Sequence, residues 1–149
     1  FIARRLIISA AEDIGLANPT ALVMANNCFD ALQKIGWPEG RIILSQCTIY
    51  LALSAKSNSA YLAINKAQSI VREKGDSSIP LSLRNAPTKL MEELDYGKDY
   101  LYSHDNLDKL HLQEFLPDEI KGTSIYKPKQ NKKESEYGKL IEKIWKGKY

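Results

Sequence analysis

The residues of this chain that could do chemistry are a small set of nucleophiles and bases. Cys47, Ser57 and Ser59 could act as nucleophiles, and His104 and His111 could act as general bases. Any protein of 149 residues offers a similar inventory. No nucleophile-elbow sequence accompanies these residues, so their spacing does not predict covalent catalysis.

The sequence also lacks carboxylate pairs with the spacing of an acid/base dyad, phosphate-binding loops and metal-ligand clusters. The acids of Glu12-Asp13 and of Glu92-Glu93 are adjacent, so on a helix each pair diverges by about 100° and makes a poor acid/base dyad. None of the eight glycines lies in the GxxxxGK pattern that cradles phosphates. The two cysteines and two histidines lack the close pairing that is typical of zinc sites. We therefore expect no catalytic residue, cofactor or metal in this chain.

The composition is that of a globular protein, with 44% hydrophobic and 26% charged residues. The sequence has no basic-then-apolar leader and no apolar run near the ~20 residues that cross a bilayer. We therefore expect a cytoplasmic protein with no membrane partner. Cys28 and Cys47 both lie in apolar helical patterns, which favours buried thiols over a disulfide. The helical pattern begins at Phe1 itself, so we expect the chain to be part of a longer protein.

Charge is distributed unevenly along the chain. Residues 121–149 contain nine lysines and three glutamates, a net charge of +6, whereas residues 1–120 have a net charge of −3. A basic segment of this kind could bind the phosphate backbone of a nucleic acid. A solvated lysine-rich surface is the favoured interpretation, because charge runs usually serve that purpose and this segment has no arginine for forked phosphate contacts.

The elements that must position these residues are helices. Apolar spacing predicts a helix over residues 1–14, a second from Asn18-Pro19 to Gly36, and a buried third over residues 41–53. A fourth begins at Ser57 or Asn58 and ends at Gly75, with Leu62 and Val71 among its expected core residues. A short helix covers residues 88–94, and residues 116–122 form one turn.

The last helix is amphipathic and follows a polar, lysine-rich linker. Residues 96–116, rich in tyrosine, have no sustained period and are expected to be ordered but irregular. We expect an all-α fold, a compact bundle of about five main helices. Its boundaries are predicted as a helical domain over residues 1–126, with residues 127–149 as the linker and last helix packed on that domain. The apolar stripe of the last helix comprises Tyr137, Leu140, Ile141, Ile144 and Trp145.

Two polar signatures carry a family resemblance. One is Lys56-Ser57-Asn58-Ser59-Ala60-Tyr61, and the other runs from Leu83-Arg84-Asn85-Ala86-Pro87 to Met91 and is followed by Tyr96-Gly97-Lys98. An opening Ala3-Arg4-Arg5-Leu6 with Glu12-Asp13-Ile14-Gly15 precedes them in the same order. Together they resemble the C-terminal region of the RarA/MgsA family of AAA+ ATPases, which are relatives of the clamp loaders. One local departure is Asp95, where a glycine is common.

The resemblance implies the role of an assembly domain. It implies a helical region comparable to a clamp-loader collar, which joins copies of the protein into a homotetramer. ATP and magnesium would bind in an ATPase part outside this chain. DNA and single-strand-binding protein would be partners of the whole protein in replication-fork maintenance and recombination. A nucleic-acid-binding module acting through the basic segment is the alternative function.

Several residues of the signatures are candidates for contacts, with a local role open for most of them. Arg4 and Arg5 could pair across a subunit interface, reach a nucleotide, or pair locally with acids such as Glu12 or Asp13. Asn85 is expected to cap the helix that follows Pro87 rather than to contact a neighbour. The tyrosines after residue 95 are expected to pack an irregular loop rather than to stack bases. The full set of candidates is Arg4, Arg5, Glu12, Asp13, Lys56, Ser57, Asn58, Tyr61, Arg84, Asn85, Lys89, Tyr96, Lys98, Tyr100 and His104.

Overall fold

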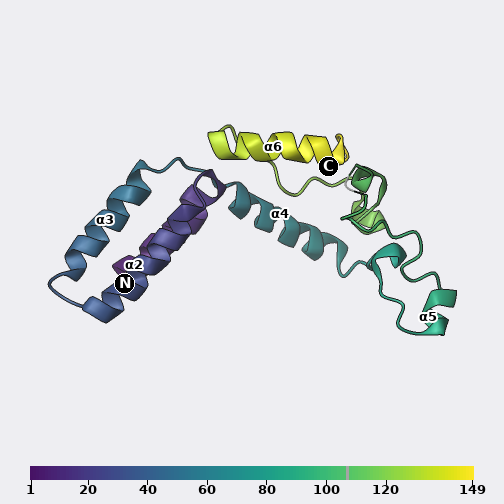
Figure 1. Cartoon of the computed structure of the whole chain (residues 1–149), viewed down its shortest axis with the longest axis horizontal. Coiled ribbons are helices and arrows are strands. Elements are labelled where there is room, and N and C mark those ends of the chain that lie inside the picture. Colours follow the sequence, from purple (N-terminus) through teal and green to yellow (C-terminus); the bar gives the residue numbers. More distant parts are fainter. Residues whose placement is uncertain (107) are drawn as a thin grey trace. The chain divides into compact units, whose positions relative to one another are not determined.

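The regular structure of the chain is helical (Figure 1). The computed structural model describes residues 1–106 and 108–149. Within that part there is no strand, which confirms the all-α prediction, and five of the six α-helices have eight or more residues. The helices are α1 (Ile2–Ser9), α2 (Thr20–Ile35), α3 (Gly40–Leu53), α4 (Ser59–Lys74), α5 (Lys89–Glu93) and α6 (Lys132–Trp145).

The chain divides into two units. The first unit comprises Phe1–Asn65 and Tyr126–Gly138, and the second comprises Lys66–Ile125 and Lys139–Tyr149. Residues of α4 and of α6 are thus shared between the units. Among the described residues, no helix is long and apolar enough to span a membrane.

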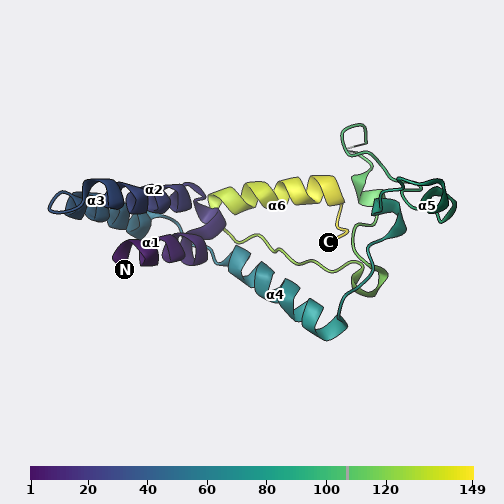
Figure 2. The same ribbon diagram turned by 90° about the horizontal axis from the view of Figure 1, so that it is seen from below.

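Three helices build the core of the first unit. Figures 1 and 2 show α2 and α3 side by side, with α1 against them. Most of the buried side chains are small, which allows the helix axes to approach closely. Cys28 and Cys47 are free buried thiols, as predicted, and burial raises the pKa of Cys47 to about 11. The core cluster comprises Ala10, Ile14, Ala21, Ala25, Cys28, Cys47 and Leu51.

The first predicted helix ends where the sequence indicated, at Gly15. After α1 the chain widens into a π-helical turn, Ala10–Ile14, and Gly15 then has a φ of 48°. A side chain at this position would place its Cβ 2.6 Å from the backbone oxygen of Ser57. Only glycine combines this backbone conformation with so close an approach. Gly15 therefore brings the loop before α4 against the end of the first helical segment.

The start of α2 differs from the prediction. The helix begins at Thr20, and the side chain of Asn18 makes no capping bond to it. The Asn18 amide instead donates to the hydroxyl oxygens of Tyr50 and Ser54, each at 3.0 Å. The Asn18 side chain, which was expected to cap α2, is thus bound to two hydroxyl groups near the end of α3. The helix ends at Gly36, as predicted, with a φ of 72°.

Helix α3 is less buried than predicted. Its sequence is apolar nearly all round, and the expected result was a buried helix. Cys47 and Leu51 are buried, but Ile42, Ile49 and Leu53 keep 62%, 56% and 83% of their surface exposed. Only one side of α3 packs on the core, so its outer side presents apolar groups to solvent. Similarly, the expected core residues Leu62 and Val71 of α4 are exposed.

The second unit contains more irregular structure. As predicted, α4 ends at Gly75, which has a φ of 74°. The expectation that Asn85 caps α5 is wrong, because Thr88 is the N-cap and its hydroxyl accepts from the backbone N–H of Met91 at 3.4 Å. Residues 96–116, apart from residue 107, which lies outside the described residues, contain one short 3₁₀ turn, Leu110–Leu112. The predicted turn after residue 116 is a 3₁₀ turn at Asp118–Ile120.

Candidate functional site

A buried carboxylate, Glu134, organises the polar residues of the first unit. Its side chain is fully buried near the start of α6. The hydroxyl of Tyr126 donates to Glu134 Oε1 at 3.0 Å, and the amide of Asn131 donates to Oε2 at 2.5 Å. The hydroxyls of Ser57 and Ser59, both buried, also contribute to its electrostatic environment. We call Ser57, Ser59, Tyr126, Asn131 and Glu134 the Glu134 cluster.

Glu134 is ionised in this cluster. Burial alone would raise its pKa from the ordinary value of 4.5, but the hydrogen bonds outweigh that effect and lower the pKa to about 2. A carboxylate that is this acidic and already accepts several hydrogen bonds is a poor general base. The cluster therefore supports no proton transfer near neutral pH. Its role is structural, because it joins the residues around Tyr126 and Asn131 to the loop that precedes α4.

The sequence contains a local signal for part of this cluster, at Asn131 and Glu134. The backbone N–H of Glu134 donates to the side-chain oxygen of Asn131 at 2.9 Å, while the Asn131 amide bonds the carboxylate in return. The first bond is the N-cap half of a capping box, while the carboxylate accepts from the side-chain amide of Asn131 and not from its backbone N–H. An Asn-x-x-Glu pattern just before an apolar stripe thus predicts the start of α6. Nothing local to the sequence predicts that Ser57 and Ser59 join it.

The remaining residues of the first signature also make internal contacts. The ammonium group of Lys56 donates to the backbone oxygens of Leu51 at 2.8 Å and Ser54 at 2.6 Å, so it caps the carboxyl end of α3. The side-chain oxygen of Asn58 accepts a bond from Lys129. Tyr61 is about half exposed. The first signature therefore fixes a turn between α3 and α4.

The second signature forms a separate arrangement in the second unit. The guanidinium of Arg84 donates to the backbone oxygen of Ile79 at 2.8 Å and to the hydroxyl of Tyr96 at 3.2 Å. It also lies 5.1 Å from the centre of the Tyr96 ring, a cation–π distance. The backbone N–H of Gly97 donates to Leu81 at 2.8 Å. The two parts of the second signature, around Arg84 and around Tyr96, thus contact each other. Tyr96 holds the irregular loop that follows α5 through this contact.

Other residues after α5 are more exposed. Lys98 forms an ion pair with Asp95 at 2.9 Å, and the hydrogen bond and charge of Asp95 raise the pKa of Lys98. Asp95 has a φ of 62°, in the left-handed region that favours glycine. Tyr100 and His104 are exposed, and the His104 ring lies 5.2 Å from the ring of Tyr102. The positive φ explains why a glycine suits the position of Asp95.

Arg4, Arg5, Glu12 and Asp13 lie on the surface of the first helical segment. Within residues 1–106 and 108–149, neither arginine forms an ion pair with either acid. Asp13 instead accepts from the hydroxyl of Ser9 at 2.7 Å. Asn85 and Lys89 are likewise exposed, in the second unit. A role for any of these residues in contacting a neighbour stays a prediction.

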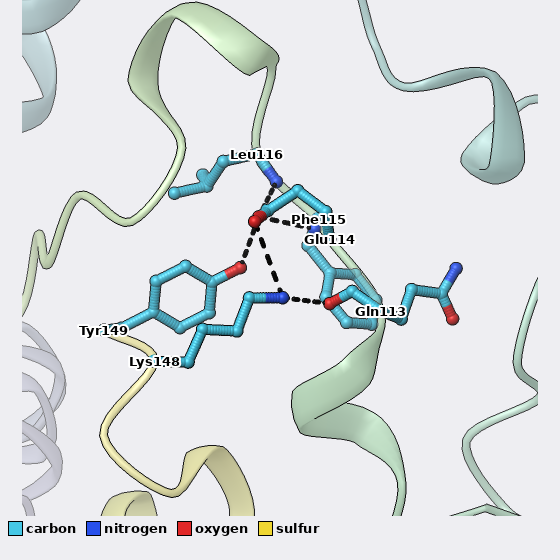
Figure 3. A network of polar contacts seen from close by, with 6 residues as sticks. All are labelled: Gln113, Glu114, Phe115, Leu116, Lys148 and Tyr149. Carbon is cyan, nitrogen blue, oxygen red and sulfur yellow. Dashed lines mark hydrogen bonds and ion pairs between the residues drawn. The ribbon is translucent and has the colours of Figure 1, made fainter.

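A polar anchor in the second unit holds the residues that follow α6 (Figure 3). Lys148 donates to the backbone oxygen of Gln113 and forms an ion pair with Glu114 at 3.6 Å. The hydroxyl of Tyr149 donates to the same carboxylate at 2.8 Å. Burial would raise the pKa of Glu114, but bonds from two backbone N–H groups, Tyr149 and Lys148 lower it overall. This anchor was not predicted from the sequence, because its partners lie 35 residues apart.

Four of the nine lysines in residues 121–149 have internal partners. Besides Lys129 and Lys148, Lys133 pairs with Glu136 at 3.2 Å, and Lys146 donates to the backbone oxygen of Asp108 at 3.4 Å. In the described part of the chain, no group of three or more histidine, cysteine or acidic side chains is arranged to hold a metal ion.

An exposed apolar surface on α3 is the feature of the first unit that is best suited to contact another molecule. Ile42, Ile49 and Leu53 follow one another at i, i+7 and i+11, so they form one stripe along the helix, which we call the α3 stripe. Two shallow hollows lie along the stripe, and Gln46 and Ile49 line both of them. Large apolar side chains that gather on one helix face typically mark an interaction surface.

Comparison with known proteins places the chain in a family. The family model described as the MgsA AAA+ ATPase C terminal matches residues 1–145. Replication-associated recombination protein A of Coxiella burnetii is 43% identical over 129 residues, which cover 86% of this chain and 29% of that protein. The proteins of the same name from Escherichia coli K12 and Bacillus subtilis are 39% and 42% identical, and the matched residues cover 97% and 99% of this chain.

The matches cover only 32% and 35% of those two relatives, so the chain spans about a third of the curated relatives' length. The family model covers the signatures, the Glu134 cluster and all of α6. The resemblance inferred from the signatures is thereby confirmed. The chain belongs to the family of MgsA AAA+ ATPase C-terminal domains, the C-terminal region of the RarA/MgsA replication-associated recombination proteins.

Proposed function

We propose that this chain is the assembly module of a AAA+ ATPase and that four copies join through it into a homotetramer. The observation that carries the proposal is the α3 stripe. Ile42, Ile49 and Leu53 are between 56% and 83% exposed, although α3 packs its other side on the core. Obligate interfaces are built from surfaces of this kind, because burying a large aliphatic side chain contributes about 1.5–3 kcal/mol.

The role of the whole protein is also a proposal. Relatives that bear the name replication-associated recombination protein A support a function in replication-fork maintenance and recombination for the longer protein. In this proposal the longer protein is a DNA-dependent ATPase of the cytoplasm that binds ATP and magnesium outside this chain. DNA and single-strand-binding protein are its partners, and this chain plays the part of a clamp-loader collar.

The mass of the particle in solution tests the assembly proposal. We expect sedimentation equilibrium to give four times the protomer mass of 16.8 kDa. Ile49→Glu should weaken association at least tenfold, because a charge would have to be buried at the interface. Val71→Glu on α4 is a matched control, since Val71 is also 56% exposed. A monomer at micromolar concentration contradicts the assembly, and dissociation by Val71→Glu alone contradicts the choice of α3.

Binding of nucleic acid through the basic segment is a second candidate. It is supported by five lysines of residues 121–149 that have no internal ion pair or hydrogen bond among the described residues. Anisotropy of labelled single-stranded DNA should then show affinity that falls steeply between 50 and 200 mM salt. Replacing the five lysines with glutamine should abolish the binding. A binding affinity that changes neither with salt nor with these substitutions contradicts this candidate function. These lysines are Lys121, Lys127, Lys132, Lys139 and Lys143.

A further inference from the structure

A second apolar surface of the first unit lies away from the α3 stripe. It is a hollow of about 390 Å³ where the start of α1 meets the end of α2 and the beginning of α3. Its lining is almost entirely apolar, and the aromatic side chains of Phe1 and Trp37 are 97% and 72% exposed. We call it the Trp37 groove. Its main lining residues are Phe1, Ile2, Phe29, Leu32, Trp37 and Leu44.

We propose that the Trp37 groove receives the residues that directly precede Phe1 in the longer protein. This inference rests on the proposed function, in which an ATPase part lies outside this chain. The chain spans about a third of its relatives, and the family model describes their C-terminal part. A segment that comes from the ATPase part must therefore enter at Phe1, which itself lines the groove.

The position of Phe1 supports the same occupant. Phe1 and Ile2 both line the groove, so a segment joined to Phe1 begins directly beside it. A helix of ordinary amphipathic pattern would place its apolar side chains into the groove and its polar face toward solvent.

The size of the groove favours a tethered segment over a second copy. A hollow of about 390 Å³ accommodates a few apolar side chains. A stable interface between separate proteins involves about 20–30 residues on each partner, whereas nine residues line this hollow. A segment joined to Phe1 needs less contact area, because its effective concentration at the groove is in the millimolar range. Docking there would hold the ATPase part at a fixed orientation on the assembly module.

Hydrogen exchange of the full-length protein tests this inference. We expect the ~15 residues before Phe1 to be protected and to exchange about tenfold faster in Trp37→Ala. Ile2→Ser, at the same groove, should have the same effect. Both side chains are more than half exposed, so neither substitution removes a core residue. Ile42→Ala, on the α3 stripe, is the matched control and should leave that exchange unchanged.

Hydroxyl-radical footprinting of the same samples reads Trp37 directly. We expect its oxidation, corrected for intrinsic reactivity, to fall below that of Tyr102, which is 55% exposed. Full reactivity of Trp37, or free exchange of the preceding residues in the natural protein, would overturn the inference. Protection that disappears on dilution would assign the groove to a second copy and overturn it as well. Sedimentation of these samples tests assembly separately, so a tetramer with a reactive Trp37 refutes only the docking.

Discussion

Replacing Glu134 with glutamine is expected to lower the free energy of unfolding by about 3 kcal/mol at neutral pH. The magnitude follows from the pKa of Glu134, which falls from 4.5 to about 2 on folding. Each pKa unit corresponds to 1.36 kcal/mol, so ionised Glu134 stabilises the folded chain by roughly 3 kcal/mol relative to its neutral form. Glutamine is neutral at every pH, so it takes the place of the protonated carboxyl group in this comparison.

The pH dependence has a definite sign. The folded state lowers the pKa of Glu134, so its contribution is fully present above the ordinary pKa of 4.5 and is lost as the pH falls toward 2. The difference in unfolding free energy between natural protein and Glu134→Gln should therefore shrink from about 3 kcal/mol at pH 7 toward zero near pH 2. Other titrating groups are common to both proteins and largely cancel in this difference.

Urea unfolding followed by circular dichroism at 222 nm, at one protein concentration and at several pH values, measures this difference. Glu136→Gln is the matched control, because Glu136 lies two residues away in the same helix and forms only an exposed ion pair with Lys133. Its effect should stay below about 0.5 kcal/mol. A Glu134→Gln effect below that limit at pH 7, or one that stays constant down to pH 2.5, would refute the reasoning.

Substitutions at three further positions test other contacts by the same urea assay. Gly15→Ala should destabilise the chain by about 2–4 kcal/mol, because a Cβ at φ 48° would lie 2.6 Å from the Ser57 oxygen, and an unchanged midpoint would contradict that. Tyr149→Phe should cost about 1–2 kcal/mol by removing a hydrogen bond to ionised Glu114, and no loss would mean that the anchor does not persist in solution. Asp95→Gly should change stability by less than about 0.5 kcal/mol, whereas Asp95→Val should cost more than 1 kcal/mol, since a β-branched residue is strained at φ 62°. Equal effects at Asp95 would contradict the strain argument.

Helix positions were predictable because they depend on short-range signals. Gly15, Gly36 and Gly75 end helical segments where the sequence indicated, each with a positive φ. Apolar spacing located the helices between them. The two errors in capping have different causes. Asn18 does not cap α2 because its side chain bonds acceptors near the end of α3. Asn85 does not cap α5 because Thr88 lies closer to the helix and caps it. Such choices depend on partners that neighbouring residues do not reveal.

The exposure of α3 was not predictable from its own residues. A helix that is apolar all round can be covered by its own chain or by another molecule, and the pattern of apolar residues is the same in both cases. The Glu134 cluster was partly predictable, since the pattern from Asn131 to Glu134 is local. Its contacts with Ser57 and Ser59 join residues more than 70 positions apart, and spacing carries no information on those.

The residues of the two polar signatures and the residues proposed to join subunits are different sets. Lys56 caps α3, Ser57 belongs to the Glu134 cluster, and Arg84 lies over Tyr96, so these signature residues act inside the chain. The α3 stripe contributes nothing to the polar signatures. Substitutions in the signatures should therefore lower unfolding free energy first, and those in the stripe should weaken association with little effect on folding. A signature variant that dissociates the assembly at unchanged stability would show that the two sets overlap.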